Sequence, residues 1–345
     1  MRVKFEYLFN FAASYSGGGF KRLQAYANWF NANGGARFVL NPRCAHLKDE
    51  LPKNHYFVMT QSRFRRIFDD CAYLNGIGRE IGTPELYYSY GIPLYWRFGT
   101  INWFHLSNVL PLCTSGIPLS PFERGKARFL GMKIRSGLAL ADVISAESNF
   151  SLDVISPGLG QKGFVSVNGS DDELKYLRNL AMEKKDDTAI LLGTQRYKAI
   201  EDSVSVFAMI KKDHQQLKLI ILGNPKYIQR KHRSNPDVVI RGILDRDEVL
   251  HCLRKAKFFI STTFIENSYN AASEGIFMAD ESYISDIGPH RELLQNMPYE
   301  RVPVLGVDRQ LLHVNRDTLS LANLKNWDTV VVEMIDRHIQ AMRER

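Results

Sequence analysis

The chain lacks the features that define several classes of protein. None of its apolar runs approaches the roughly 18 residues that a membrane-spanning helix needs. Its four cysteines form no CxxC pair and no zinc-like spacing with histidine, so we expect free thiols in a reducing compartment. Residues 2–9 alternate like a buried strand and are not typical of a signal peptide. We therefore expect a cytoplasmic protein, at most peripheral on the inner face of the membrane.

What the sequence does contain is typical of a soluble globular protein. Apolar residues make up 45% of the chain and charged residues 24%. Its 345 residues suit two domains of ordinary size. Repeats and low-complexity segments are absent.

The net charge of +8 is unevenly distributed. Residues 1–165 contain 19 Lys+Arg and 11 Asp+Glu, whereas residues 166–345 contain 26 of each, so the whole surplus lies in the first half. This asymmetry predicts that the first half faces an anionic partner, such as a membrane surface, a phosphate-bearing acceptor or nucleic acid. Two basic clusters with interleaved aromatic residues favour an anionic lipid surface over ordinary solvated helix faces: Arg63-Phe64-Arg65-Arg66, and Arg124, Lys126, Arg128, Lys133 and Arg135 around Phe122 and Phe129.

Strand-like runs alternate with helical patterns throughout, which predicts parallel α/β architecture. In the first half we expect strands near 2–9, 36–41, 55–59, 101–106 and 141–145, with helices near 20–33, 61–75 and 123–139. In the second half we expect strands at 188–193, 217–223, 237–241, 257–261 and 283–286, with helices near 198–211, 245–255, 269–279, 289–295 and 327–343.

A turn signal at Asn168-Gly169, followed by capping residues at 170–172, marks the expected linker. We predict an N-terminal domain at 1–167, a C-terminal domain at 168–326 and a last segment, 327–345, that packs back on the N-terminal domain. Doubly wound sheets bind ligands at the carboxyl ends of their strands.

Two features of the first half are candidate ligand contacts. The run Ser16-Gly17-Gly18-Gly19 follows the first strand and opens a helix, where glycines admit a ligand to the backbone and the helix N-terminus favours negative charge. An ordinary tight turn is the alternative, but a triple glycine exceeds what a turn needs. His105 ends an apolar strand, where it could bond a sugar hydroxyl or a phosphate, or could be a histidine satisfied in the core.

The second half carries the richer constellation. Glu266 follows the buried strand 257–261, and Glu274 lies eight residues later in the next helix. Loop amides and a helix N-terminus suit a diphosphate or sugar hydroxyls, and a carboxylate suits ribose hydroxyls. Taken alone, the two glutamates could equally be solvated or capping acids. Arg196 and Lys198 follow the strand 188–193, where two cations could bind a diphosphate and stabilise it as a leaving group.

In their order and spacing, these features resemble the large bacterial group 1 family of retaining glycosyltransferases of the GT-B fold (family 4-like), which includes lipopolysaccharide and mannosyl transferases. The resemblance covers nearly the whole chain. It is carried by the glycine loop 16–19, His105, the segments 144–150 and 167–173, Arg196 and Lys198 after Gly193, the strand end Leu222-Gly223, the Glu-x7-Glu pair Glu266 and Glu274, and the segment 285–293.

The resemblance implies two Rossmann-like domains that face each other across a cleft, and a sugar transfer from a nucleoside-diphosphate donor that keeps the anomeric configuration. It implies that Glu274 binds the ribose, that Glu266 and the amides of Asn267, Ser268 and Tyr269 hold the donor sugar, and that Arg196 and Lys198 neutralise the diphosphate. Gly18 and Gly19 would approach the donor phosphate or the acceptor, and His105 would contact the transferred sugar.

The setting implied is bacterial surface polysaccharide synthesis, such as O-antigen, with a saccharide acceptor linked to a lipid diphosphate. No cofactor is expected and no metal is expected to be required. Asp245-Arg246-Asp247 spells a DxD, but it precedes a helix and is interpreted as a helix cap.

The chain also departs from the family pattern. It reads ENSY at 266–269 in place of E-G-F-G, Ala279-Asp280-Glu281 in place of G-x-P, and Thr194 in place of an arginine. The donor sugar therefore does not follow from the resemblance. A sugar-nucleotide enzyme of other chemistry, such as an epimerase, is the alternative. Nucleic-acid binding is suggested only by the pI near 9.2 and has no motif to support it, so no nucleic-acid partner is expected.

Overall fold

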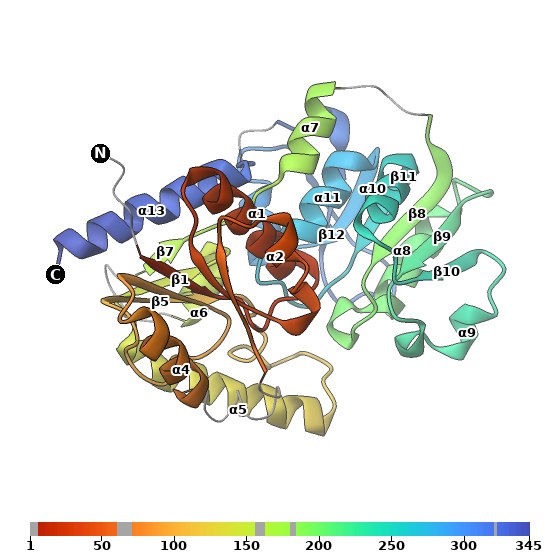
Figure 1. Ribbon diagram of the computed structural model, residues 1–345. Helices are drawn as coiled ribbons and strands as arrows, with labels where there is room; N and C mark the ends of the chain where they lie inside the picture. The colour runs from red at the N-terminus through yellow and green to blue at the C-terminus, as the bar shows by residue number, and fades with distance from the viewer. Residues whose placement is uncertain (1–5, 61–70, 156–162, 180–183, 321–322) are drawn as a thin grey trace. The chain divides into compact units, whose positions relative to one another are not determined.

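The structure is a computed structural model that describes residues 6–60, 71–155, 163–179, 184–320 and 323–345 (Figure 1). It divides into two compact units. Unit 1 comprises Met1–Thr114, Pro121–Gly169 and Lys325–Arg345, and unit 2 comprises Ser115–Ser120 and Ser170–Leu324. None of the described helices is long and apolar enough to cross a membrane.

Unit 1 is built on a seven-stranded, wholly parallel sheet in the order β3-β2-β1-β4-β5-β6-β7. Its strands are β1 (Tyr7–Asn10), β2 (Arg37–Leu40), β3 (His55–Val58), β4 (Leu86–Tyr90), β5 (Ile101–Leu106), β6 (Val143–Ala146) and β7 (Gly163–Val165). The described helices longer than one turn are α1 (Gly17–Asn33), α4 (Cys71–Ile81), α5 (Pro121–Gly137), α6 (Asn149–Ile155) and the C-terminal α13 (Trp327–Arg343), with the short α2 at Leu47–Glu50.

The strand order reverses between β1 and β4, so the topological switch point of unit 1 lies between these two strands. The glycine-rich segment follows β1 here and opens α1, as the sequence predicts. The part of the expected helix 61–75 that covers 61–70 lies outside the described residues, and α4 begins at Cys71.

The sequence prediction missed β4, although this strand pairs with β1 at the switch point. Its sequence is LYYSY and all five residues are buried. In a pattern of alternating apolar and polar residues, tyrosine is easily counted as a surface residue. A buried tyrosine is nevertheless stable where its hydroxyl forms a hydrogen bond. Here the Tyr87 hydroxyl accepts from Nδ2 of Asn10 at 2.8 Å, and the Tyr90 hydroxyl donates to Oε1 of Glu147 at 2.7 Å.

The last helix, α13, belongs to unit 1 although it is farthest along the chain (dark blue in Figure 1). Its buried face joins the core of β1 and α1 through Val330, Val331 and Met334. The buried ring of His338 meets Tyr7 edge-on, with 3.2 Å between Nδ1 and the tyrosine hydroxyl.

Unit 2 has a seven-stranded mixed sheet in the order β10-β9-β8-β11-β12-β14-β13. The strands are β8 (Asp186–Leu192), β9 (Lys218–Leu222), β10 (Val238–Gly242), β11 (Ala256–Ser261), β12 (Glu281–Ser285), β13 (Glu300–Val302) and β14 (Leu311–Asn315). Its described helices include α7 (Asp171–Asn179), α8 (Ile200–Ile210), α9 (Arg230–Arg233), α10 (Arg246–Lys255), α11 (Asn270–Met278) and α12 (Gly288–Leu293).

The first five strands of this sheet are parallel, whereas β14 pairs antiparallel with both β12 and β13. The sequence prediction contained no strand for β13 or β14. The chain winds outward through β8, β9 and β10 and then returns to place β11 beside β8. The switch point of unit 2 therefore lies between β8 and β11.

Helix α11 lies close against β11 because Gly275 faces the strand. A Cβ added at Gly275 would come within 2.1 Å of the Phe259 ring. This close approach sets the start of α11, and with it the position of Glu274, relative to the end of β11.

Candidate functional site

The candidate site of unit 2 is formed by two loops at its switch point. The first loop follows β8 and runs from Gly193 to Ala199, and the second follows β11 and runs from Thr262 to Tyr269. Both leave the carboxyl ends of adjacent parallel strands, which is where ligands of doubly wound sheets bind. The structure thus brings together the two segments that the sequence singled out in the second half.

The two loops are joined by hydrogen bonds to the backbone of the first loop. The amide of Phe264 donates to the carbonyl of Tyr197 at 2.8 Å, and the Thr262 hydroxyl donates to the carbonyl of Ala199 at 2.8 Å. Gly193 has φ 85° and Ala199 has φ 49°, so both ends of the first loop turn through left-handed backbone. The charged side chains between them are therefore held by a defined loop.

Lys198 and Glu266 form a direct ion pair across the two loops. The lysine side chain is 12% exposed and the glutamate 19%, so the pair is partly shielded from water. Burial alone would lower the pKa of Lys198, but the charges of Glu266, Tyr197 and, farther away, Glu274 raise it above its ordinary value. Lys198 is therefore a firmly charged ammonium group.

Glu274 lies in the second turn of α11 and is 6% exposed. Its Oε1 accepts from Nη1 of Arg246 at 2.8 Å, and Nη2 of the same guanidinium lies 2.7 Å from Oδ2 of Asp172. Three helices, α7, α10 and α11, thus meet in one ion-pair chain. The sequence analysis predicted neither Arg246 nor Asp172 as part of the site.

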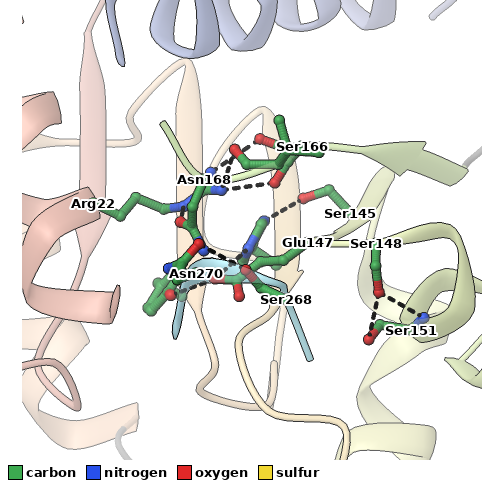
Figure 2. Close-up of polar contacts among 12 residues, drawn as sticks. Arg22, Ser145, Glu147, Ser148, Ser151, Ser166, Asn168, Ser268 and Asn270 are labelled. Carbon is green, nitrogen blue, oxygen red and sulfur yellow. Dashed lines mark hydrogen bonds and ion pairs between the residues drawn. The ribbon is translucent and has the colours of Figure 1, made fainter. Parts of the chain in front are cut away.

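The remaining residues predicted to contact the donor lie in the two loops. The Ser268 hydroxyl donates to Oδ1 of Asn270 at 2.8 Å (Figure 2), Tyr269 is the buried N-cap residue of α11, and Asn267 precedes them in the same loop. Arg196 begins a short 3-10 turn and is exposed. The segment that reads ENSY, at 266–269, lies in the loop between β11 and α11.

His290 is a buried neighbour that the sequence analysis did not single out as a site residue. It lies in α12, is 1% exposed, and its Nδ1 is 2.8 Å from the carbonyl of Ser285. Burial lowers its pKa to about 4, although the charge of Glu266 acts in the opposite direction. The ring is therefore neutral near pH 7.

The DxD segment forms a helix cap, which confirms the sequence interpretation. The Asp245 carboxylate accepts from the amide of Glu248 at 2.9 Å, and the Glu248 carboxylate accepts from the amide of Asp245 at 3.0 Å. This reciprocal pair is a capping box.

In unit 1, the predicted glycines lie at the switch point. Gly17 has φ 62°, which suits a residue without a side chain, and a Cβ added at Gly19 would come within 3.0 Å of both Ser14 Oγ and the Tyr90 ring. Gly18 and Gly19 are partly exposed at the first turn of α1. The backbone there packs closely on the end of β4.

His105 is fully buried at the end of β5, between aromatic rings. Its ring stacks on Tyr90 with centroids 5.0 Å apart, and its Nδ1 lies 2.7 Å from Ser145 Oγ. The Trp103 indole can only donate, and it donates to the same Ser145 oxygen at 2.6 Å. The serine hydroxyl is then best satisfied by donating to Nδ1, which leaves the imidazole proton on Nε2.

That Nε2 lies 3.7 Å from Oε1 of the buried Glu147. Burial, followed by the charge of Arg22, lowers the pKa of His105 to about 4. The structure therefore places this residue inside a polar core, and its contact with a transferred sugar stays a prediction.

Arg22 is the centre of that polar core, and the sequence analysis did not identify it. It is fully buried on α1, and its guanidinium donates to Asn168 Oδ1 at 3.1 Å, to Ser166 Oγ at 2.9 Å and to the Ser166 carbonyl at 2.7 Å (Figure 2). Further bonds reach the Tyr26 hydroxyl and the Val167 carbonyl, and the group lies over the Trp327 ring at 5.6 Å. No spacing rule signals such a residue, because its partners are mostly distant in sequence.

Most of the basic cluster of α5 lies on the outer face of the helix, whereas the half-buried Arg124 donates to the carbonyl of Thr114 at 3.1 Å. Phe122 and Met132 are 82% and 58% exposed, and Phe129, partly exposed, lies between them on the same side of the helix. Basic residues border this apolar stripe on both sides, with Lys126 and Lys133 on one side and Arg128 and Arg135 on the other. The other predicted cluster, Arg63-Phe64-Arg65-Arg66, lies outside the described residues.

No protein-family model matches the sequence, and a search of curated proteins finds no match. Solved structures do match the fold. Sucrose-phosphate synthase from Thermosynechococcus elongatus has a TM-score of 0.68 at 13% identity, covering 99% of this chain and 100% of that one. AviGT4, a glycosyltransferase involved in avilamycin A biosynthesis, has a TM-score of 0.59 at 12% identity, covering 99% of each chain.

HepE of Anabaena, solved in complex with UDP-glucose, has a TM-score of 0.57 at 14% identity, covering 84% of this chain and 83% of that one. At such identities the likeness establishes the fold alone. Together with the two α/β sheets, it shows that the chain has the GT-B fold, with two Rossmann-like domains.

Proposed function

We propose that this protein is a retaining glycosyltransferase that moves a sugar from a nucleoside-diphosphate sugar to a saccharide acceptor. The observation that carries the proposal is the switch point of unit 2, where Lys198, Glu266 and Glu274 meet the start of α11 on a GT-B fold. A cation, two carboxylates and the amides at a helix N-terminus are the groups that suit a diphosphate, a ribose and a sugar.

In this proposal, Glu274 accepts hydrogen bonds from the ribose, while Lys198 and Arg196 bind the diphosphate. Glu266 and the amides of Asn267, Ser268 and Tyr269 hold the donor sugar. In unit 1, Gly18 and Gly19 approach the donor phosphate or the acceptor, and His105 contributes to the sugar contact.

Without a ligand, the ammonium group of Lys198 is neutralised by Glu266. A bound diphosphate competes with Glu266 for this ammonium group. The attraction between the diphosphate and the lysine increases as the bond to the sugar breaks and negative charge grows on the leaving oxygen. Interactions that strengthen in this way raise turnover more than affinity. The leaving diphosphate takes the proton of the acceptor hydroxyl on the same face, so no protein nucleophile, cofactor or metal is required.

The test is a thermal-shift panel of UDP, GDP, ADP and their glucose, mannose and N-acetylglucosamine derivatives, because a ligand that binds only the folded state raises the melting temperature. We expect one nucleotide series to stabilise the protein, with and without EDTA. Proton NMR of the product made with the stabilising donor then reports the anomeric configuration. A panel without any shift contradicts the proposed donor site, and an inverted product contradicts the retaining mechanism.

An epimerase-like activity is the weaker alternative. It predicts conversion of the nucleotide sugar to an isomer in the absence of any acceptor. Incubating the stabilising donor with the protein alone, and following it by NMR, separates the two activities.

For the acceptor, we propose a saccharide linked to a lipid diphosphate, as in O-antigen-like lipopolysaccharide synthesis, with α5 resting on the anionic inner face of the membrane. The support is the exposed stripe of Phe122, Phe129 and Met132 between two basic borders. Apolar insertion and lysine or arginine contacts with anionic lipid reinforce each other at such a face.

We expect the protein to sediment with vesicles that contain phosphatidylglycerol, and to do so less in high salt. The double variant Phe122→Ser, Met132→Ser should reduce sedimentation several-fold without changing the melting temperature, since both side chains are exposed. A matched control is Leu305→Ser, because Leu305 is 96% exposed in unit 2. Equal binding to neutral and anionic vesicles would count against the proposal.

A further inference from the structure

Arg246 occupies an unusual position for a residue at the start of a helix. Its backbone is fixed by the capping box that begins at Asp245, and it is the first residue of α10. From there its guanidinium reaches two carboxylates on two other helices, Glu274 of α11 at 2.8 Å and Asp172 of α7 at 2.7 Å. An ordinary first-turn arginine would extend into solvent, because a helix N-terminus disfavours positive charge.

The two carboxylates differ in exposure. The Glu274 side chain is 8% exposed, whereas that of Asp172 is 44% exposed. A carboxylate as buried as Glu274 depends on a charged hydrogen-bond partner, and Arg246 supplies one. Asp172 holds the opposite edge of the guanidinium, so the arginine is fixed from both sides.

We propose that Arg246, held by Asp172, is a positioning residue that fixes Glu274 for the ribose of the donor and thereby sets a preference for ribonucleotides over 2′-deoxyribonucleotides. The inference rests on the proposed function of Glu274. It goes further, because it names the groups that orient this carboxylate and the part of the ligand on which they act.

The physical reason is geometric. A carboxylate whose Oε1 is bonded to an anchored guanidinium cannot turn freely, so its direction toward a ribose is set before the ligand arrives. A fixed carboxylate accepts from the two neighbouring ribose hydroxyls and loses one charged hydrogen bond when the 2′-hydroxyl is missing. A carboxylate that is free to turn adapts to the remaining hydroxyl and discriminates less. A site built for a hydroxyl group rejects the analogue that lacks it.

The experiment compares the dissociation constants of UDP, GDP and ADP with those of dUDP, dGDP and dADP by calorimetry, using the pair that binds most tightly. The variants are Arg246→Met, Arg246→Lys, Asp172→Asn and Glu274→Gln, together with the double variant Arg246→Met, Glu274→Gln. The matched control is Arg254→Met, which makes the same substitution two turns further along α10. The melting temperature of each ligand-free variant is measured in parallel.

We expect the wild-type protein to prefer the ribonucleotide by roughly tenfold or more, the size of one charged hydrogen bond. Arg246→Met should weaken ribonucleotide binding and leave deoxyribonucleotide binding nearly unchanged, so the preference collapses. Arg246→Lys should keep part of the preference, because lysine supplies the charge but lacks the planar guanidinium that bonds to both carboxylates. Asp172→Asn, at a more exposed position, should lower the preference for the ribonucleotide in part. It serves as the second variant if Arg246→Met does not fold. Arg254→Met should keep the preference.

The double variant tests how Arg246 acts. If it acts through Glu274, then Arg246→Met has no further effect on binding once Glu274→Gln is present. A preference that survives in Arg246→Met but collapses in Glu274→Gln overturns the role of Arg246 and leaves the donor site standing. A Glu274→Gln variant that binds both nucleotides as the wild type does removes the proposed ribose site itself, and with it this inference.

Discussion

The two units differ in the surroundings of their charged side chains. In unit 1, Arg22 is fully buried and its guanidinium bonds to carbonyls, hydroxyls and an amide oxygen. In unit 2, Lys198 and Arg246 are partly exposed, and each is paired with a carboxylate, Glu266 in the loop after β11 and Glu274 in α11. The first arrangement is closed off inside the core, whereas the second is partly open to solvent.

This difference in burial predicts that the Arg22 network contributes mainly to stability and that the unit 2 ion pairs contribute mainly to binding. A buried cation with several internal acceptors has no partner to give up without cost, because each acceptor left behind in the core is costly to leave unbonded. The ion pairs of unit 2 lie closer to water, so water can solvate part of what the loss of one partner leaves behind. We therefore expect substitutions in the two units to affect different measurements.

The largest effect is expected for Arg22→Met. The substitution removes the hydrogen bonds that Arg22 donates to Ser166, Val167 and Asn168, and it also removes the cation near Glu147. Breaking a buried charged network of this kind costs about 3–5 kcal/mol of unfolding free energy. Urea unfolding measures this loss.

Gln24→Met is the control for Arg22→Met, since residue 24 is exposed on the same helix. It should change the unfolding free energy by less than about 0.5 kcal/mol. A similar loss in both variants would show that α1 as a whole is sensitive to substitution and that Arg22 has no special role.

The next effect, in the other unit, is expected for Lys198→Ala. At saturating donor its turnover should fall about 100-fold, because in the proposed mechanism the lysine stabilises charge that develops on the leaving diphosphate. The unfolding free energy should fall much less than in Arg22→Met. Enzymatic assay and urea unfolding of the same preparation test both halves of this expectation.

Lys226→Ala, at an exposed position in the same unit, is the control and should keep both properties. Wild-type turnover in Lys198→Ala would remove the lysine from the proposed mechanism. A stability loss as large as that of Arg22→Met would erase the distinction between the units.

The sequence predicted much of this arrangement, and the exceptions have physical reasons. The alternation of strands and helices, the glycines that open α1 and the capping box at Asp245 are local patterns, and the structure confirms them. Strand β4 was missed because the pattern of a tyrosine-rich segment does not predict a fully buried strand. Strands β13 and β14 were missed because short antiparallel strands carry little periodicity.

The candidate site was predicted only in part, for a related reason. Lys198, Glu266 and Glu274 stand in a recognisable order after two strands. Arg246 and Asp172 come from helices far apart in sequence, and only the packing of α7, α10 and α11 brings them to Glu274. A side chain that reaches across three helices leaves no spacing signal.

The smallest effect that we expect is a response to acid, and here the two units behave alike. Burial lowers the pKa of His105 and His338 in unit 1, and of His290 in unit 2, to about 4 in each case. In the unfolded chain a histidine has a pKa near 6.5. Between these values the unfolded state binds more protons than the folded state, so stability is complete above about pH 6.5 and is lost as the pH falls toward 4.

Each of these histidines should therefore cost about 2 kcal/mol of stability between pH 7 and pH 5. His105→Asn removes one such group and retains a polar atom near Ser145, so its unfolding free energy should fall by about 2 kcal/mol less than that of the wild type over this range. His251→Asn, at an exposed position, should leave the acid response unchanged. If His105→Asn loses as much stability as the wild type on acidification, His105 takes up a proton as readily in the folded state as in the unfolded chain. The lowering of its pKa by burial would then be wrong.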